Sequence, residues 1–236
     1  MRSAWGWLVG VHRGIEATPW GGILLGNVWP AYLFALSLGA RFVGLVQSLP
    51  DLETASINER ARVLQEVLTL AFLALVVVLF AVRRRAIRGR RATWQEGLVA
   101  LTGTFLLTIV GYLPVPDTTS TESLLASSAI VIVGTVFTIW ALGTLGRCFG
   151  IMPEVRGLVR GGPYAWVRHP VYLGEVISAF GIVLAKPHPF VFLAWAAFAG
   201  FQYWRTIYEE RALQAAFPSE YGAYRARVSR LVPGLR

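Results

Sequence analysis

The chain has 236 residues, of which 55% are hydrophobic, 13% aromatic and 15% charged, and its mean hydropathy is +0.55. Soluble domains carry about 25% charged residues, so this composition excludes an ordinary soluble globule. The apolar residues fall in several runs of about twenty, which is long enough to cross a hydrocarbon core of ~30 Å. We therefore predict an all-α, multi-pass integral membrane protein.

The formal net charge is +9, from 22 basic and 13 acidic side chains. Lys186 is the one lysine, and the arginines lie between the apolar runs rather than on one soluble face. This placement is typical of cytoplasmic loops, so we expect membrane lipids and no nucleic acid among the partners. Cys148 is the one cysteine, which excludes an internal disulfide, and without a second thiol no metal site is predicted.

Four apolar runs precede residue 146. The first, residues 23–49, contains Pro30 and Arg41, so we expect a kinked or tilted helix. The second, residues 63–82, is followed by six arginines within residues 83–91, which places that loop in the cytoplasm. By alternation, residues 96–113 cross outward, residues 124–145 return, and both termini are cytoplasmic. The Arg-rich, Lys-poor composition further indicates a bacterial inner membrane.

Two shorter apolar stretches follow, residues 171–185 and 190–203. Between them lies Lys186-Pro187-His188-Pro189, which a continuous helix does not tolerate. We predict a helical hairpin whose second arm continues to Ala216, giving about six hydrophobic helical segments in all. The chain then divides into an N-terminal transmembrane region, residues 1–145, and a C-terminal region, residues 146–236, that holds most of the clustered polar residues.

Polar residues cluster at two places in the C-terminal region. Pro170 suits the first position of a helix, and the unpaired N–H groups there, with Arg168 and His169 beside them, favour a carboxylate or phosphate. Further along, Arg205 and Glu209 are four residues apart and share a helix face. They form either an ion pair on the helix surface or the wall of a polar cavity, since facing lipid is costly.

Three blocks of sequence carry a family resemblance. They are Gly-Pro-Tyr-Ala-Trp-Val-Arg-His-Pro-Val-Tyr-Leu-Gly at 162–174, Arg-Thr-Ile-Tyr-Glu-Glu at 205–210, and the tyrosine-rich stretch at 217–233. In this order and spacing they resemble the C-terminal signature of the isoprenylcysteine carboxyl methyltransferase family and its phospholipid methyltransferase relatives. The resemblance implies an integral membrane enzyme with S-adenosylmethionine as its cofactor, held in a cytoplasmic C-terminal pocket, and a lipophilic or lipid-like acceptor.

The resemblance also assigns roles to individual residues. It places the cofactor pocket on the first block, closed by two acids of the last long helix: Gly162, Pro163, Tyr164, Val167, His169, Pro170, Tyr172, Glu209 and Glu210. It places Arg168, Arg205 and Glu209 at the reacting groups, with the arginines near the acceptor and Glu209 supporting Arg205. From the residues alone, His169 has a simpler interpretation as the cap of the helix that Pro170 begins.

The chemistry of the acceptor remains open between three groups. A carboxylate needs a cation to hold it, for which Arg205 is the candidate, and it needs no general base. A thiol or an amine would need its proton removed, by Glu209 or His169. Residues 147–154 depart from the pattern of family members that act on prenylated protein, so a small lipophilic acid, thiol or amine is expected.

Two other functions compete with the methyltransferase. Membrane reductases of the sterol reductase type share a similar arginine-histidine-proline motif and a glycine-glutamate pair, matched here by Gly174 and Glu175, but bind NADPH. A non-catalytic membrane transport or assembly protein would have the same hydropathy. Ligand binding distinguishes the three.

Overall fold

The structure, a computed structural model, describes residues 28–84, 86, 96, 99–100, 102–104, 106, 120–152 and 154–235. Within these residues it is all-helical, as predicted. The helices, in chain order, are α3 (Trp29–Ser48), α4 (Ile57–Val82), α6 (Thr121–Leu145), the short 3-10 helices η2 (Gly146–Cys148) and η3 (Gly162–Ala165), and then α7 (Pro170–Ala185), α8 (Pro189–Ala216) and α9 (Pro218–Arg227).

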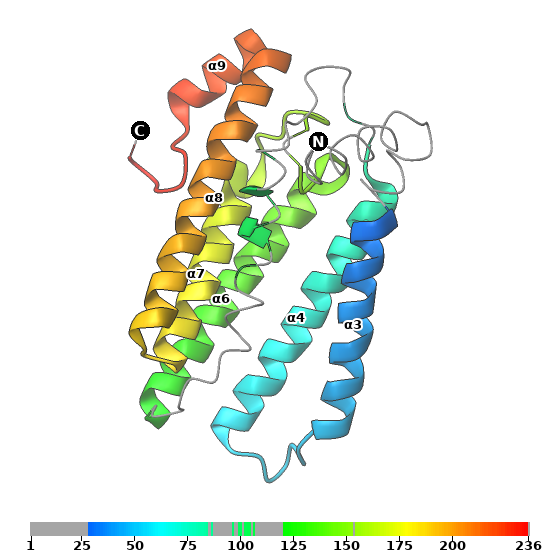
Figure 1. Ribbon diagram of the computed structural model, residues 1–236, viewed down its shortest axis with the longest axis vertical. Helices are drawn as coiled ribbons and strands as arrows, with labels where there is room; N and C mark the ends of the chain where they lie inside the picture. Colours follow the sequence, from blue (N-terminus) through cyan, green and yellow to red (C-terminus); the bar gives the residue numbers. More distant parts are fainter. Residues whose placement is uncertain are drawn as a thin grey trace, which may run out of the picture.

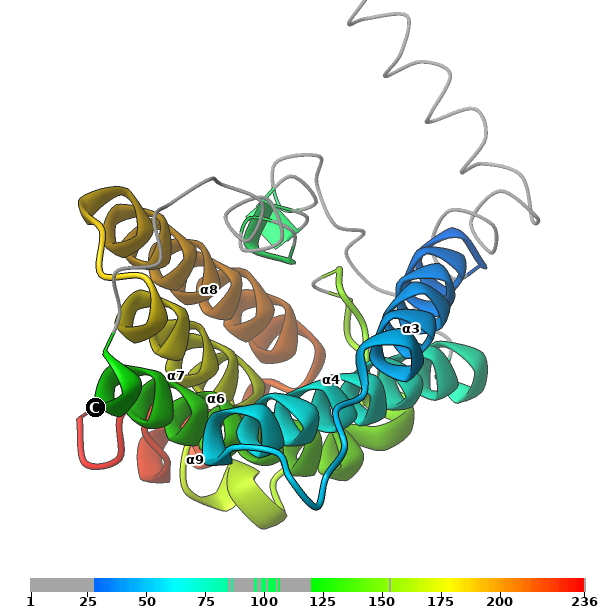
Figure 2. The same cartoon turned by 90° about the horizontal axis from the view of Figure 1, so that it is seen from below.

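The helices are arranged as an open arc. Viewed from below, α8, α7, α6, α4 and α3 follow one another along the arc, with α3 and α4 joined as an antiparallel pair (Figures 1 and 2). The helices α3, α4 and α6 are long and apolar enough to cross a membrane, and α7 is a shorter apolar helix. The chain is therefore a multi-pass integral membrane protein.

The observed spans differ in detail from the predicted ones. Pro30 lies in the first turn of α3, where its missing N–H costs nothing. The start of the predicted span, residues 23–27, lies outside the described residues, so the expected kink or tilt stays a prediction. The helix continues without a break through Arg41 to Ser48. Residues 1–27, most of the predicted span at 96–113, and most of the arginine cluster after Arg84 lie outside the described residues.

Among the described helices, α6 and α7 form the most extensive interface, and small residues allow them to approach closely. An added Cβ at Gly134 would lie 2.4 Å from the backbone nitrogen of Ser178, and one at Gly174 would lie 2.3 Å from Oγ1 of Thr138. The hydroxyl of Ser127 donates to the carbonyl of Gly181 at 2.7 Å. Small residues and hydroxyl groups are the means by which helices associate in lipid.

The predicted hairpin and its long second arm are present. The helix α7 ends at Ala185, α8 begins at Pro189 and runs to Ala216, and α9 packs against its end (Figure 1). After α9 the chain returns to the start of α7, where Arg168 N–H donates to Ser229 O at 2.8 Å and His169 N–H to Arg230 O at 3.1 Å. This return brings the end of the chain against the polar block that precedes α7.

Candidate active site

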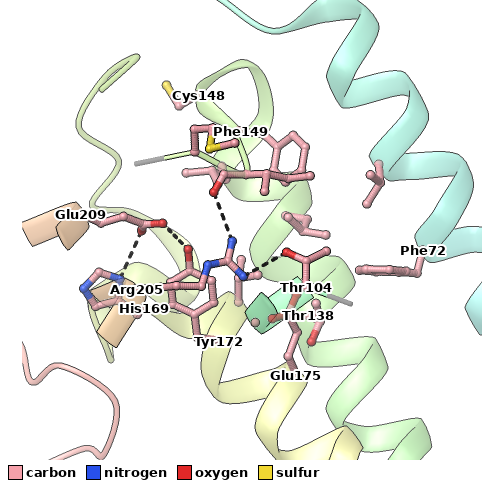
Figure 3. A pocket seen from close by; sticks show the side chains of 18 of the residues that line it. Phe72, Thr104, Thr138, Cys148, Phe149, His169, Tyr172, Glu175, Arg205 and Glu209 are labelled. Atoms are coloured by element: carbon pink, nitrogen blue, oxygen red, sulfur yellow. Dashed lines mark hydrogen bonds and ion pairs between the residues drawn. The ribbon is translucent and has the colours of Figure 1, made fainter. Parts of the chain in front are cut away.

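A cavity of about 1150 Å³ lies among α3, α4, α6, α7 and α8 and the loop that follows α6. Its volume exceeds that of most pockets for a single small molecule, which are ~300–1,000 Å³. Most of the wall is apolar, and the polar side chains converge on the face made by α7 and α8 (Figure 3).

Glu209, on α8, lines the cavity and lies between Tyr172 of α7 and His169, the residue that precedes α7. The hydroxyl of Tyr172 donates to Glu209 Oε1, and Nδ1 of His169 lies 3.7 Å from Glu209 Oε2. The rings of His169 and Tyr172 stack, with their centroids 5.8 Å apart (Figure 3). The stack fixes both donors against one carboxylate, whose remaining surface faces the cavity.

The imidazole of His169 lies between two carboxylates. Its Nε2 is 3.3 Å from Glu210 Oε1, opposite the contact with Glu209. Burial lowers the pKa of His169, but hydrogen bonds and charge from Glu209 and Glu210 outweigh it and raise the pKa above its ordinary value. The side chain makes no capping hydrogen bond to α7, so the cap interpretation gives way to a partner of the two acids.

Arg205 occupies the centre of the cavity wall and is 7% exposed. Its guanidinium lies 4.6 Å from the ring centroid of Tyr172 and points toward Thr104 (Figure 3). NH1 donates to Gln202 Oε1 at 3.0 Å, and NH2 donates to the carbonyl of Ile151 at 3.3 Å. Within the described residues its Nε is buried without a hydrogen-bond partner. A buried guanidinium with an unused donor is suited to an anionic ligand.

Arg205 and Glu209 do not form the ion pair that their spacing allows. Within the described part of the chain, no ion pair joins them, and Tyr172 connects them instead, with its ring against Arg205 and its hydroxyl on Glu209. The helix-surface interpretation is therefore wrong, because both side chains line the cavity.

Glu210 holds the end of the chain to the bundle rather than lining the cavity. Arg168 binds Oε1 at 2.9 Å, and Arg230 binds Oε2 at 2.8 Å, both from outside α8. Arg168 also donates to the carbonyls of Arg225, at 3.2 Å, and Val228. These contacts fix the segment after α9 beside the first turn of α7.

The structure brings together six of the predicted site residues around the cavity, namely Tyr164, Arg168, His169, Tyr172, Arg205 and Glu209. The others support this wall from behind. Gly162, at φ +57°, packs against Thr144, Pro163 and Pro170 are fully buried, and Val167 pairs with Ser229. The contacts predicted for these residues with cofactor and acceptor stay predictions.

Two cavity residues, Glu175 and Tyr221, and their neighbour Gln202 were missing from the predicted site. Gln202 and Glu175 meet in a hydrogen bond between α8 and α7, and Tyr221 of α9 has a buried hydroxyl without a partner in the described residues. Gln202 precedes Arg205 by three residues, and Glu175 follows Tyr172 by three. That helical spacing was the available signal for both. Among the described residues, no three His, Cys, Asp or Glu side chains gather as metal ligands.

The sequence is similar to membrane methyltransferases over its C-terminal half. Residues 123–220 match the phospholipid methyltransferase family. Protein-S-isoprenylcysteine O-methyltransferase of Saccharomyces cerevisiae is 32% identical over 114 residues, which are 44% of this chain and 46% of that protein. The chain thus matches about half the length of this curated relative.

The fold is similar over nearly the whole chain. The solved structure of the eukaryotic intramembrane Ras methyltransferase, an isoprenylcysteine carboxyl methyltransferase, matches with a TM-score of 0.52 at 18% sequence identity, covering 98% of this chain and 84% of that chain. The sequence match is to the phospholipid methyltransferase family, and the fold is similar to that of an intramembrane methyltransferase. The predicted resemblance to the isoprenylcysteine carboxyl methyltransferases and phospholipid methyltransferases is confirmed.

Proposed function

We propose that this protein transfers a methyl group from S-adenosylmethionine to the carboxylate of a lipophilic acceptor that enters from the bilayer. The observation that carries the proposal is the pair of opposite charges on one cavity wall. Glu209 offers a carboxylate, and Arg205, on the other side of Tyr172, offers an unused buried donor. The first suits a cationic methyl donor and the second an anionic acceptor.

The cavity residues fit the methyl donor. The carboxylate of Glu209 complements a sulfonium, and the unpartnered hydroxyl of Tyr221, which lines the same cavity, offers a hydrogen bond to a nucleoside. Tyr164 supplies an aromatic wall nearby. Glu209, His169, Tyr221 and Tyr164 are the residues that would hold S-adenosylmethionine. When bound, it supplies a methyl group on a positively charged sulfur that leaves as a neutral thioether.

A carboxylate acceptor is consistent with a wall that presents the fixed guanidinium of Arg205. Carboxylates are ionised at neutral pH, with pKa values of about 4, so the attacking oxygen needs no proton removed. Both ring nitrogens of His169 already face carboxylates. Arg205 would orient the acceptor oxygen, and apolar side chains such as Phe149 and Leu142 would exclude water from the charged partners.

We further propose that the end of the helix bundle that holds the C-termini of α4 and α6 and the N-terminus of α7 faces the cytoplasm. The support is the charge of the segments at this end, where Arg83, Arg84, Arg147 and Arg160 follow or precede apolar helices. The loop between α3 and α4, with Asp51 and Glu53, would face outward. The cofactor-binding part of the site, in the C-terminal region at residues 146–236, would then face the cytoplasm.

Ligand binding by the detergent-solubilised protein tests the proposal. S-adenosylmethionine, S-adenosylhomocysteine and NADPH would be titrated while the thermal unfolding midpoint is followed. We expect both adenosyl compounds to stabilise the protein and NADPH to have no effect. Glu209→Gln should weaken the binding of S-adenosylmethionine about tenfold, or ~1.4 kcal/mol. It should weaken the binding of S-adenosylhomocysteine less, because the sulfur of that compound is uncharged. Glu220→Gln, an exposed acid on α9, is the matched control.

Two other results of this titration would contradict the proposed methyltransferase. Stabilisation by NADPH alone would assign the chain to the reductases. No stabilisation by any of the three would contradict an enzyme of either type and favour the transport or assembly function.

A further inference from the structure

Glu175 is an acid inside the cavity that the proposed reaction does not use. It lies on α7, one turn beyond Tyr172 and in the apolar part of that helix, and its side chain lines the cavity (Figure 3). Gln202 Nε2 donates to its Oε2, and within the described residues this is its one hydrogen bond. An ionised carboxylate accepts about four. An acid at membrane depth is costly unless it serves a ligand or a partner.

Gln202 links Glu175 to the arginine that would hold the acceptor. The amide nitrogen of Gln202 binds Glu175, and the amide oxygen accepts from Arg205 NH1 at 3.0 Å. Gln202 is 1% exposed, so this bridge is fixed. No ion pair joins Arg205 and Glu175 directly among the described contacts. The guanidinium and the carboxyl group therefore lie at the two ends of one amide group, and both side chains line the same cavity.

The side chains of Arg205 and Glu175 together favour one class of acceptor over another. A simple carboxylate bound to Arg205 would neutralise the arginine and leave Glu175 without a positive partner in an apolar cavity, which is unfavourable. An acceptor that carries both a carboxylate and an ammonium would satisfy both side chains. In an α-amino acid, one carbon separates these two groups, which suits two protein charges joined through a single amide.

We propose that Glu175 is a specificity-determining residue that binds an ammonium group next to the acceptor carboxylate. The acceptor class is then a zwitterion with a lipophilic tail, its carboxylate on Arg205 and its ammonium on Glu175. This inference rests on the proposed methyl transfer to a carboxylate and narrows its substrate. It assigns Glu175 to acceptor binding, so S-adenosylmethionine binding does not depend on it.

Three acids with the same tail test the inference: S-geranylcysteine, its N-acetyl derivative, and 3-(geranylthio)propanoic acid, which lacks the nitrogen. Transfer of labelled methyl would be measured at several concentrations of each. We expect the wild type to prefer the free amino acid about tenfold or more in kcat/KM, the usual effect of a hydrogen bond to a charged group. Glu175→Gln should remove this preference by raising KM for the free amino acid while its kcat changes little.

Controls separate binding from folding and from the reaction itself. Glu175→Gln should retain stabilisation by S-adenosylhomocysteine, and Glu122→Gln, a change of an exposed acid in the first turn of α6, should keep the wild-type preference. Equal loss of activity of Glu175→Gln toward all three acids, or a wild type that prefers the acetylated or nitrogen-free acid, would overturn the inference and leave the methyltransferase intact. Failure to methylate any of the three acids would overturn the carboxylate proposal as well.

Discussion

Arg205 is the residue on which acceptor binding depends. Its planar guanidinium uses NH1 and NH2 to hold Gln202 and the carbonyl of Ile151, and its buried Nε remains open within the described residues. Lysine has no such planar set of donors. We expect Arg205→Lys to lower kcat/KM for the acceptor about a hundredfold, or ~2.7 kcal/mol, mainly through KM.

Two measurements check the assignment of Arg205. Stabilisation by S-adenosylhomocysteine should survive in Arg205→Lys, because Glu209 and His169 do not bind this side chain. Arg211→Lys, an exposed change on the same helix, should leave the kinetics unchanged. An Arg205→Lys enzyme with wild-type KM would contradict the role of Arg205 in holding the acceptor.

Glu210 should make the fold sensitive to acid. Burial would raise the pKa of Glu210, but hydrogen bonds from His169, Arg230 and Arg168 outweigh it and hold the pKa well below its ordinary range. The folded state therefore gains stability from this ionised group above the unfolded pKa of about 4.3, and loses it as the pH falls below that value. We expect the unfolding midpoint to fall steeply below about pH 4.3.

The variant Glu210→Gln isolates this contribution. It leaves two arginines without their partner, so we expect a loss of about 3–5 kcal/mol at neutral pH and a flatter pH dependence. Glu220→Gln should keep the slope of the wild type. An unchanged acid slope in Glu210→Gln would show that other groups cause the acid sensitivity.

Helical spacing in the sequence predicted which residues share a helix face, but it did not predict contacts between helices. The spacing of Arg205 and Glu209 placed both on one face of α8, and both line the cavity. The bond between Gln202 and Glu175 joins residues 27 apart on two helices. It depends on how α7 packs against α8, which helix periodicity does not specify.

At the scale of elements, the contact of α6 with α7 supports the site because α7 carries Tyr172 and Glu175. We expect Gly134→Ala to destabilise the protein by about 1–3 kcal/mol, since its Cβ would meet the backbone of Ser178 at 2.4 Å. Gly143→Ala lies on the same helix with nothing within 4 Å of its Cβ and is the matched control. Thermal unfolding in detergent would compare them, and equal midpoints would contradict the close packing.

The helices themselves were largely predictable from the sequence. Hydropathy located α4, α6 and both arms of the hairpin, and Pro170 correctly began α7. Pro30 lies in the first turn of α3, a position that composition does not distinguish from the interior of a longer span. The return of the chain after α9, through Ser229 and Arg230, left no periodic signal in the sequence.

At the scale of the whole molecule, the arrangement predicts the orientation in the membrane. Alkaline phosphatase inserted in the loop at residues 51–56 should be active in bacterial cells, and the same enzyme fused after residue 236 should be inactive. The arginine-rich ends of the helices cause this asymmetry. An active C-terminal fusion would contradict the proposal that the cofactor-binding part of the site faces the cytoplasm.

The central claim is that a carboxylate takes the methyl group. The direct test incubates the protein with methyl-labelled S-adenosylmethionine and S-geranylcysteine, extracts the product and treats it with alkali. A methyl ester releases its label as methanol, whereas a methylated amine or thioether keeps it. We predict alkali-labile label that is absent in Arg205→Ala. Label that resists alkali would contradict the claim and would indicate that the nitrogen of the acceptor is methylated.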